Sequence, residues 1–294
     1  MTDSICYLNG KFLPLSKAKI GITDIGLLRG YGVYDGLTTY NNKVFRSSDH
    51  FARLKKSADA LGLKLPMTEK ELDSIFAELI TRNGFPRTNF RVIATGGPTF
   101  SGIEFDGTHP TFYVLAEAYK AIDNSFYTKG ASLFTFEHQR QYPEYKTINY
   151  ITGAMLQPRR KTEGAIEILY VADGKVLEAA TSNFFLVRGS KLIASRKNIL
   201  LGITRNVVIE LAAGTYEVEE RDIEVSEITD ADEAFITSSY KEIVPIVRVD
   251  NHTVGSGFVG PVVKDIMNRF GNYTKKWGTV DQESQVRYSF ASLS

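Results

Sequence analysis

Residues 138–154 read HQRQYPEYKTINYITGA and place Lys146 between a tyrosine and a threonine, with Asn149 three positions further on. The lysine follows a Tyr-Pro-Glu turn and precedes a run of small residues that is typical of a helix start. A lysine at such a place is ordinarily a solvated surface charge. Its amine has a pKa of about 10.4 in model peptides, so it becomes a nucleophile only where burial or a cationic neighbour lowers that pKa. The surrounding sequence therefore decides whether Lys146 does covalent chemistry.

The composition is that of an ordinary globular protein and limits the classes of function. The chain has 294 residues, 43% hydrophobic and 23% charged, which is enough for two domains with buried cores. A net charge of +1 gives no general attraction to nucleic acid or membranes. The single cysteine, Cys6, allows no intrachain disulfide and favours a reducing cytoplasm. We expect no signal peptide from MTDSICYLNGKF and no membrane helix, since no apolar run approaches about 18 residues.

The first part of the chain mixes hairpins with helices. Asn9-Gly10 predicts the turn of one hairpin and Asn41-Asn42 the turn of another. Two amphipathic helices are expected, one starting at the polar residues near 47 and ending at Gly62, the other capped by Thr68 with Glu71 and ending at Gly84. Strands are expected at 88–97 and 110–118. This mixture indicates an α+β fold rather than a doubly wound sheet.

Residues 119–130 break the apolar pattern and predict a linker between a small domain at 1–118 and a larger domain at 131–294. The larger domain is expected to contain several strands and a hairpin that turns at Asp173-Gly174. It is also expected to contain a helix over about 204–213 and a closing helix near 258–270. The polar tail, 278–294, is expected to be loose.

Glu178 stands inside an otherwise apolar strand, and Asn183 lies just beyond it. A carboxylate in such a strand is costly unless it is paired. One interpretation places Glu178 at a solvent-facing strand end. The other makes it the partner of a protonated ring nitrogen, which a pyridoxal phosphate cofactor needs as an electron sink.

Two further clusters have an ordinary structural interpretation and a functional one. Gly202 precedes a helix with Thr204 as a fair N-cap, and a helix N-terminus behind a glycine presents unpaired N–H groups that favour phosphate. A predicted strand ends at three hydroxyl residues, Thr237, Ser238 and Ser239. They form either an ordinary turn or a set of hydroxyl donors to a ligand.

In order and spacing, the segments KTINY, EAATSNFFLV, LLGITRNVVI and FITSSYKEIVPI resemble those of the fold type IV pyridoxal-phosphate enzymes, the class IV aminotransferases. DIGLLRGYGVYDGL and DHFARLKKSA resemble the N-terminal segments of that family, so the resemblance runs from about residue 5 to 270. It implies a small N-terminal sandwich-like domain and a larger C-terminal barrel-like domain, with the site between them. It also implies a homodimer acting on amino acids and 2-oxo acids.

The resemblance also assigns roles to residues. Lys146 would hold pyridoxal 5'-phosphate as a Schiff base and, once displaced, move the proton between carbon atoms. Glu178 would pair with the ring nitrogen. Helix periodicity alone places Arg53 off the apolar face as a solvated charge, whereas the resemblance makes it a phosphate ligand. The remaining expected cofactor ligands are Asn183, Gly202, Ile203, Thr204, Ser238 and Ser239.

The substrate carboxylate needs a ligand that the resemblance does not supply directly. Branched-chain aminotransferases have an arginine where this chain has Thr38, and the arginine and histidine that D-amino acid aminotransferases use are absent from residues 96–105. Arg91, which interrupts an apolar strand, and Arg29, in a glycine-bracketed loop, are either structural ion pairs or carboxylate clamps. Tyr31 and Thr38 are further substrate candidates.

Three functions of different kinds stay open. The first is a transaminase, with a lean toward D-amino acids because DIGLLRGYGVYD and YPEYKTINY resemble a divergent D-amino acid subgroup, and with branched-chain L-amino acids as the alternative. The second is an aminodeoxychorismate-type lyase, which uses the same cofactor chemistry. The third is an inactive relative, against which Lys146 and Glu178 argue.

Overall fold

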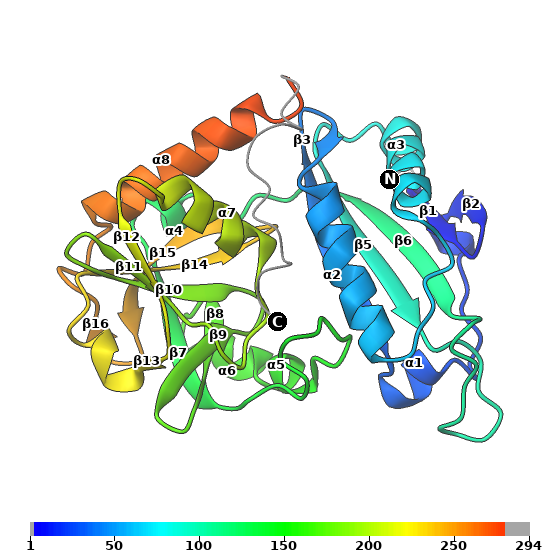
Figure 1. Ribbon diagram of the computed structural model, residues 1–294, viewed down its shortest axis with the longest axis horizontal. Coiled ribbons are helices and arrows are strands. Elements are labelled where there is room, and N and C mark those ends of the chain that lie inside the picture. Colours follow the sequence, from blue (N-terminus) through cyan, green and yellow to red (C-terminus); the bar gives the residue numbers. More distant parts are fainter. Residues whose placement is uncertain (1–2, 280–294) are drawn as a thin grey trace.

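The computed structural model describes residues 3–279 as two β-sheets with helices packed against them (Figure 1). The first sheet has the order β2-β1-β6-β5-β3-β4. Its strands are β1 (Ile5–Leu8), β2 (Lys11–Pro14), β3 (Gly32–Tyr40), β4 (Lys43–Val44), β5 (Thr88–Thr95) and β6 (Thr111–Ala118). Its helices are α1 (Ile25–Arg29), α2 (Ser47–Ala60) and α3 (Glu69–Asn83), with a 3-10 helix η1 (Leu15–Lys17).

The second sheet has ten strands in the order β12-β11-β10-β14-β15-β7-β8-β9-β13, with β16 paired to β15. The strands are β7 (Ala131–Glu137), β8 (Glu167–Ala172), β9 (Lys175–Ala179), β10 (Asn183–Arg188), β11 (Lys191–Ala194), β12 (Glu217–Glu220), β13 (Ile223–Glu224), β14 (Glu233–Ser238), β15 (Glu242–Val249) and β16 (His252–Thr253). The helices are α4 (Ser125–Thr128), α5 (Ile151–Met155), α6 (Gln157–Thr162), α7 (Ile203–Ala212) and α8 (Pro261–Lys276), with a 3-10 helix η2 (Val225–Ile228). No helix within residues 3–279 is long and apolar enough to cross a membrane.

Local sequence signals account for much of the N-terminal sheet and its helices. The Asn9-Gly10 turn joins β1 to β2 in an antiparallel hairpin, as predicted. Thr68 and Glu71 form the predicted capping box of α3, and Gly84 ends that helix in the left-handed conformation. The apolar faces of α2 and α3 then pack on the sheet and bury Leu54, Phe76 and Leu79, among others.

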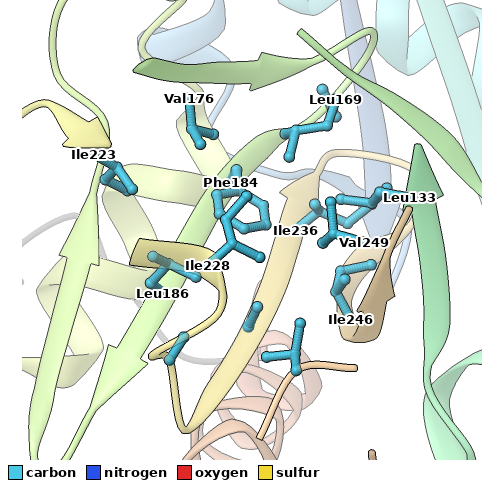
Figure 2. Close-up of a cluster of buried hydrophobic side chains, with 14 of the residues drawn as sticks. Leu133, Leu169, Val176, Phe184, Leu186, Ile223, Ile228, Ile236, Ile246 and Val249 are labelled. Atoms are coloured by element: carbon cyan, nitrogen blue, oxygen red, sulfur yellow. The ribbon is translucent and has the colours of Figure 1, made fainter. Parts of the chain in front are cut away.

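The larger sheet encloses an apolar core of its own. Leu133, Leu169, Phe184 and Ile236 come from four of its strands and pack together (Figure 2). Helices α7 and α8 cover the other face, where Val207, Val263 and Phe270 are buried. The side chains of β10 therefore alternate between two apolar layers, which explains why this strand is an almost continuous apolar run.

The two halves of the molecule are connected by more than the chain segment 119–130. Phe45, from the β3–β4 hairpin, packs in the core under α7 and α8, and the Trp277 side chain donates a hydrogen bond to the Val44 carbonyl at 3.1 Å. The predicted division into domains at 1–118 and 131–294 remains a prediction. Segment 119–130 itself contains the short helix α4.

Some element boundaries differ from the sequence expectation. Gly202, not Thr204, is the N-cap of α7, and Thr204 is buried within the first turn. The N-cap of α2 is Arg46 in the left-handed conformation, and no side chain within residues 3–279 caps this helix. Helix α8 runs to Lys276, beyond the expected end near 270. The strands β11 and β12 were not predicted, and of the tail expected to be loose, residues 280–294 lie outside the described residues.

Candidate active site

A cavity of about 520 Å³ lies between the two halves of the molecule. Its walls include β3 and β5 residues from the N-terminal sheet and β9, β10, α7 and the β14–β15 turn from the C-terminal part. Every residue predicted to hold a cofactor lines it: Arg53, Lys146, Glu178, Asn183, Gly202, Ile203, Thr204, Ser238 and Ser239. Arg91 lines it as well, whereas Arg29, Tyr31 and Thr38 do not.

Lys146 is held by its backbone at the edge of strand β3. Its N–H donates to the Ser57 hydroxyl at 3.0 Å, and its carbonyl accepts from the Tyr34 N–H at 2.9 Å. The Nζ atom lies 4.6 Å from the centre of the Tyr34 ring. No carboxylate in residues 3–279 lies within ion-pair distance of that amine. The amine is therefore positioned in the cavity and not committed to a salt bridge.

Glu178 is buried in β9 and does not face solvent, which excludes the interpretation of this residue as a solvent-facing strand end. Arg140 donates to its carboxylate from Nε at 2.8 Å and lies 2.6 Å from it through Nη2, and the Leu200 N–H donates at 3.1 Å. Burial raises the pKa of the Glu178 carboxyl above its ordinary value, although Arg140 and the Leu200 N–H favour the ionised form. A carboxylate held in this way suits a proton shared with a ring nitrogen.

Arg53 is almost fully buried, so the helix-based prediction of a solvated charge is wrong. Asp35, on β3, accepts from its Nε at 2.8 Å and from its Nη2 at 2.7 Å, and His50 Nδ1 lies 2.7 Å from the same carboxylate. Burial alone would raise the pKa of Asp35, but Arg53 and His50 outweigh burial and hold that pKa well below its usual range. The remaining nitrogen, Nη1, points toward the Leu201 carbonyl at 3.4 Å, next to α7.

The N-terminus of α7 opens into the cavity without a side-chain cap. Within residues 3–279, the N–H groups of Ile203 and Thr204 have no hydrogen-bond partner. The N-terminus of α8 differs, because Glu233 accepts from the Val262 and Val263 N–H groups at 3.0 and 2.8 Å. An unpaired helix start beside a buried arginine fits a phosphate group.

Two more features show that the residues present fit a phosphate-bearing cofactor. A Cβ on Gly202 would lie 2.1 Å from Asn183 Oδ1, so only glycine leaves the helix start and Asn183 in contact. Asn183 in turn donates to the Leu200 carbonyl at 2.7 Å. Beside Asn183 on the neighbouring strand β14, the buried Thr237 hydroxyl has no partner among the described residues, and Ser238 and Ser239 follow it along the cavity.

Several cavity residues were not found by sequence reasoning. Arg140, Tyr34, Tyr150, Tyr240 and Lys241 line the cavity. Strand alternation along β3 could have found Tyr34, because it lies two residues before Gly36 on the same face. Tyr150 was present in the quoted KTINY segment. Nothing in the local sequence marks Arg140, whose partner Glu178 is 38 residues away.

The structure brings only one of the four substrate candidates to the cavity. Arg91 lines it with a half-exposed guanidinium that pairs with Glu117 at 3.2 Å. The Tyr31 hydroxyl instead donates to the Leu61 carbonyl at 2.6 Å, and the buried Thr38 hydroxyl accepts from Arg87 at 3.1 Å. Both hydroxyls are used within the fold. Arg29 is exposed, away from the cavity of its own chain.

Comparisons with known proteins identify the class. The sequence model described as amino-transferase class IV matches residues 32–249, and the chain belongs to this family. The cofactor of the family is pyridoxal 5'-phosphate, so the enzyme is a pyridoxal-phosphate-dependent class IV aminotransferase acting on amino acids and 2-oxo acids.

The relatives carry two kinds of name. The "Putative branched-chain-amino-acid aminotransferase" of Methanocaldococcus jannaschii is 30% identical over 279 residues, covering 92% of this chain and 97% of its own. The D-alanine aminotransferase of Bacillus licheniformis is 29% identical over 274 residues, covering 90% and 95%. Among solved structures, the branched-chain aminotransferase from Thermoproteus uzoniensis with norvaline matches with a TM-score of 0.85, 26% identity and coverage of 92% and 95%. The structural match confirms the predicted fold class.

Proposed function

We propose that this aminotransferase acts preferentially on D-amino acids and that Arg91 binds the substrate carboxylate. Among residues 3–279, five cationic side chains line the cavity: Arg53, Arg91, Arg140, Lys146 and Lys241. Three of them are committed to buried carboxylates, namely Arg53 to Asp35, Arg140 to Glu178 and Lys241 to Glu167. Lys146 is reserved for the cofactor.

Among the three arginines of the cavity, Arg91 forms the most solvent-exposed ion pair. This observation carries the proposal. Both Arg91 and its partner Glu117 are about half exposed, at 49% and 47%. An exposed pair of this kind contributes little, so a substrate carboxylate can replace Glu117 at small cost. The guanidinium then offers a bidentate, charge-assisted contact.

The position of the carboxylate ligand selects the enantiomer. With the substrate amino nitrogen held at a bound cofactor, the α-hydrogen would have to point toward the Lys146 amine, which removes it as general base. Once the carboxylate is also fixed, one direction remains for the side chain. Thr38 replaces the arginine of the branched-chain enzymes, and its buried hydroxyl is already used by Arg87. Two observations support the preference for D-amino acids. The chain has Thr38 where the branched-chain enzymes have an arginine, and D-alanine aminotransferases are among the relatives.

The residues of the chain divide the remaining work. Bound pyridoxal phosphate supplies the electron sink that stabilises negative charge at the substrate Cα. Lys146 moves the proton at that carbon as general base and then general acid, a role worth typically 10²–10⁴ in rate. Glu178, held by Arg140, keeps the ring nitrogen charged. Arg53, the first turn of α7 and the serines at 238 and 239 hold the phosphate and thereby fix the ring relative to Lys146.

A branched-chain L-amino acid aminotransferase is the second candidate, favoured by the Methanocaldococcus jannaschii relative and by the Thermoproteus uzoniensis structure. Absorbance spectroscopy of the single half-reaction separates the two. The holoenzyme is mixed with D-alanine, D-leucine, L-leucine or L-valine, and conversion of the cofactor band to that of the amine form is followed. The proposal predicts faster conversion with the D-amino acids, and faster conversion with L-leucine overturns it. A lyase would release pyruvate from aminodeoxychorismate and show no conversion with 2-oxo acid acceptors.

We also propose that the enzyme is a homodimer. Large apolar side chains are exposed on α1, on α5 and on the 98–105 loop, including Leu27, Phe100 and Met155, which are 69, 99 and 72% exposed. Helices α1 and α5 both lie along the lower edge of the molecule in Figure 1. Arg29 belongs to this surface, and we keep it as a substrate ligand only in the dimer. Light scattering on the purified protein tests the assembly, and a monomer at micromolar concentration contradicts it.

A further inference from the structure

Residues 238–242 form the turn between β14 and β15, and we call them the hairpin tip. Ser238, Ser239, Tyr240 and Lys241 of this tip line the cavity. The tip therefore carries the serine hydroxyls that the proposed function assigns to the phosphate. Its contacts come from both halves of the molecule and from the segment between them.

Tyr240 ties the tip to the N-terminal sheet. Its hydroxyl donates to the carbonyl of Phe90, a fully buried residue of β5, at 2.6 Å. The ring lies against Gly36 on β3, where an added Cβ would come within 2.9 Å of the Tyr240 hydroxyl oxygen. The absence of a side chain at Gly36 is what leaves room for this contact.

Lys241 ties the tip to the C-terminal sheet and to segment 119–130. Its Nζ lies 2.7 Å from the buried Glu167 carboxylate and donates to the Thr181 hydroxyl at 2.9 Å. Its carbonyl accepts a hydrogen bond from the Tyr127 hydroxyl at 3.0 Å. Tyr127 belongs to α4 and does not line the cavity.

Glu242 closes the tip in a conformation that a residue with a side chain rarely adopts, with φ at 57°. Its carboxylate accepts from the Tyr40 hydroxyl at 2.9 Å and pairs with Arg87 Nη1 at 2.9 Å. The Arg87 guanidinium lies over the Tyr40 and Tyr119 rings, 4.2 and 3.8 Å from their centres. The contacts of this carboxylate explain why a glutamate is held in the left-handed region.

We propose that Tyr127 and Tyr240 are positioning residues, which hold the hairpin tip from opposite sides at the place where its serines meet the cofactor phosphate. The inference rests on the proposed function, because it needs a phosphate at that wall. It assigns a part in cofactor binding to Tyr127, whose hydroxyl contacts the tip backbone and not the cavity. Any effect of Tyr127 on the cofactor must then pass through the tip.

The test compares three variants that each lose one tyrosine hydroxyl. Tyr127→Phe and Tyr240→Phe loosen the tip, whereas Tyr216→Phe is the matched control, since its hydroxyl donates to Asp265 at 2.8 Å outside the cavity. The dissociation constant of pyridoxal phosphate is measured by absorbance titration, beside the melting temperature of each protein. Both tip variants are expected to raise that constant about three- to tenfold, the effect of one hydrogen bond. The control is expected to leave it unchanged.

A dissociation constant for Tyr127→Phe equal to that of Tyr216→Phe overturns the inference. In that case the unmodified enzyme still shows its cofactor band and its amino-transfer half-reaction, so the proposed function stands separately. A parent protein that binds no pyridoxal phosphate refutes the proposed function and the inference together.

Discussion

Gly202→Ala is the sharpest test of the phosphate site, because it adds one methyl group at a known distance from its neighbours. The new Cβ would lie 2.1 Å from Asn183 Oδ1, whereas ordinary contact begins at about 3.4 Å, so Asn183 or the start of α7 must retreat by roughly 1 Å. Gly202 has φ of −72°, a value that alanine adopts freely, and the effect is therefore steric and not one of backbone strain.

The retreat weakens two sets of contacts. It strains the 2.7 Å hydrogen bond from Asn183 to the Leu200 carbonyl, worth about 0.5–1.5 kcal/mol. It also moves the Ile203 and Thr204 N–H groups away from the phosphate, and a charge-assisted hydrogen bond is worth about 1.5–3 kcal/mol. We expect a net loss of about 2–3 kcal/mol, which raises the dissociation constant of pyridoxal phosphate about 30- to 150-fold.

The assay is an absorbance titration with pyridoxal phosphate, and the control is Gly271→Ala in α8. Within the described part of the chain, an added Cβ at Gly271 meets no atom within 4 Å. That variant is expected to bind the cofactor like the parent and to gain stability of about 0.5–1 kcal/mol, because alanine favours a helix interior over glycine. If Gly202→Ala binds the cofactor within threefold of the parent, the start of α7 does not hold the phosphate.

The remaining predictions concern the carboxylates and the substrate cation. Glu178→Gln is expected to bind cofactor but to lose most of its kcat, because an amide cannot keep the ring nitrogen charged, and a kcat near that of the parent would make Glu178 structural. Arg91→Ala should lower kcat/KM for α-amino acids by about 10²-fold and leave the cofactor spectrum intact, since the lost contact is worth about 1.5–3 kcal/mol. Primary amines without a carboxylate serve as the control substrates. An equal loss of kcat/KM for both substrate types would contradict the assignment. The pKa of Asp35 is held below its unfolded value, so its contribution to stability is full above about pH 4 and is lost as the pH falls further. Asp35→Asn should lower the free energy of unfolding by about 3–5 kcal/mol at pH 7 and weaken its decrease at acid pH. If denaturant titrations show the same decrease at acid pH in the variant, Asp35 is not the group responsible.

Local signals in the sequence predicted the elements whose causes are local. The Asn9-Gly10 hairpin and the Thr68–Glu71 capping box depend on neighbouring residues, and both form as expected. Lys146 and Glu178 line the same cavity although they belong to different parts of the chain. Only the resemblance to the aminotransferase family predicted that they belong to one site. The periodicity of residues within a single helix or strand does not predict which other elements it contacts.

The misplaced residues share a physical reason, which is a partner from a distant part of the chain. Helix periodicity described Arg53 as solvated, since it considers only the apolar face of α2, whereas the partner Asp35 lies on β3. Thr38 is on the same strand as Gly36, which lines the cavity. The Thr38 hydroxyl, however, accepts a hydrogen bond from Arg87, which lies 49 residues further along the chain. The anchoring of the hairpin tip by Tyr127 spans 114 residues and has no local signature.

Covalent mapping of the cofactor tests the central claim most directly. The holoenzyme is treated with borohydride, which fixes a pyridoxyl group on the lysine that bears it, and the digested protein is examined by mass spectrometry. The structure predicts modification of Lys146, whose amine has no ion-pair partner within residues 3–279, and loss of the label together with amino transfer in Lys146→Ala. A pyridoxyl group on Lys241, the other lysine of the cavity, or an unlabelled Lys146 in an active enzyme, would contradict the account.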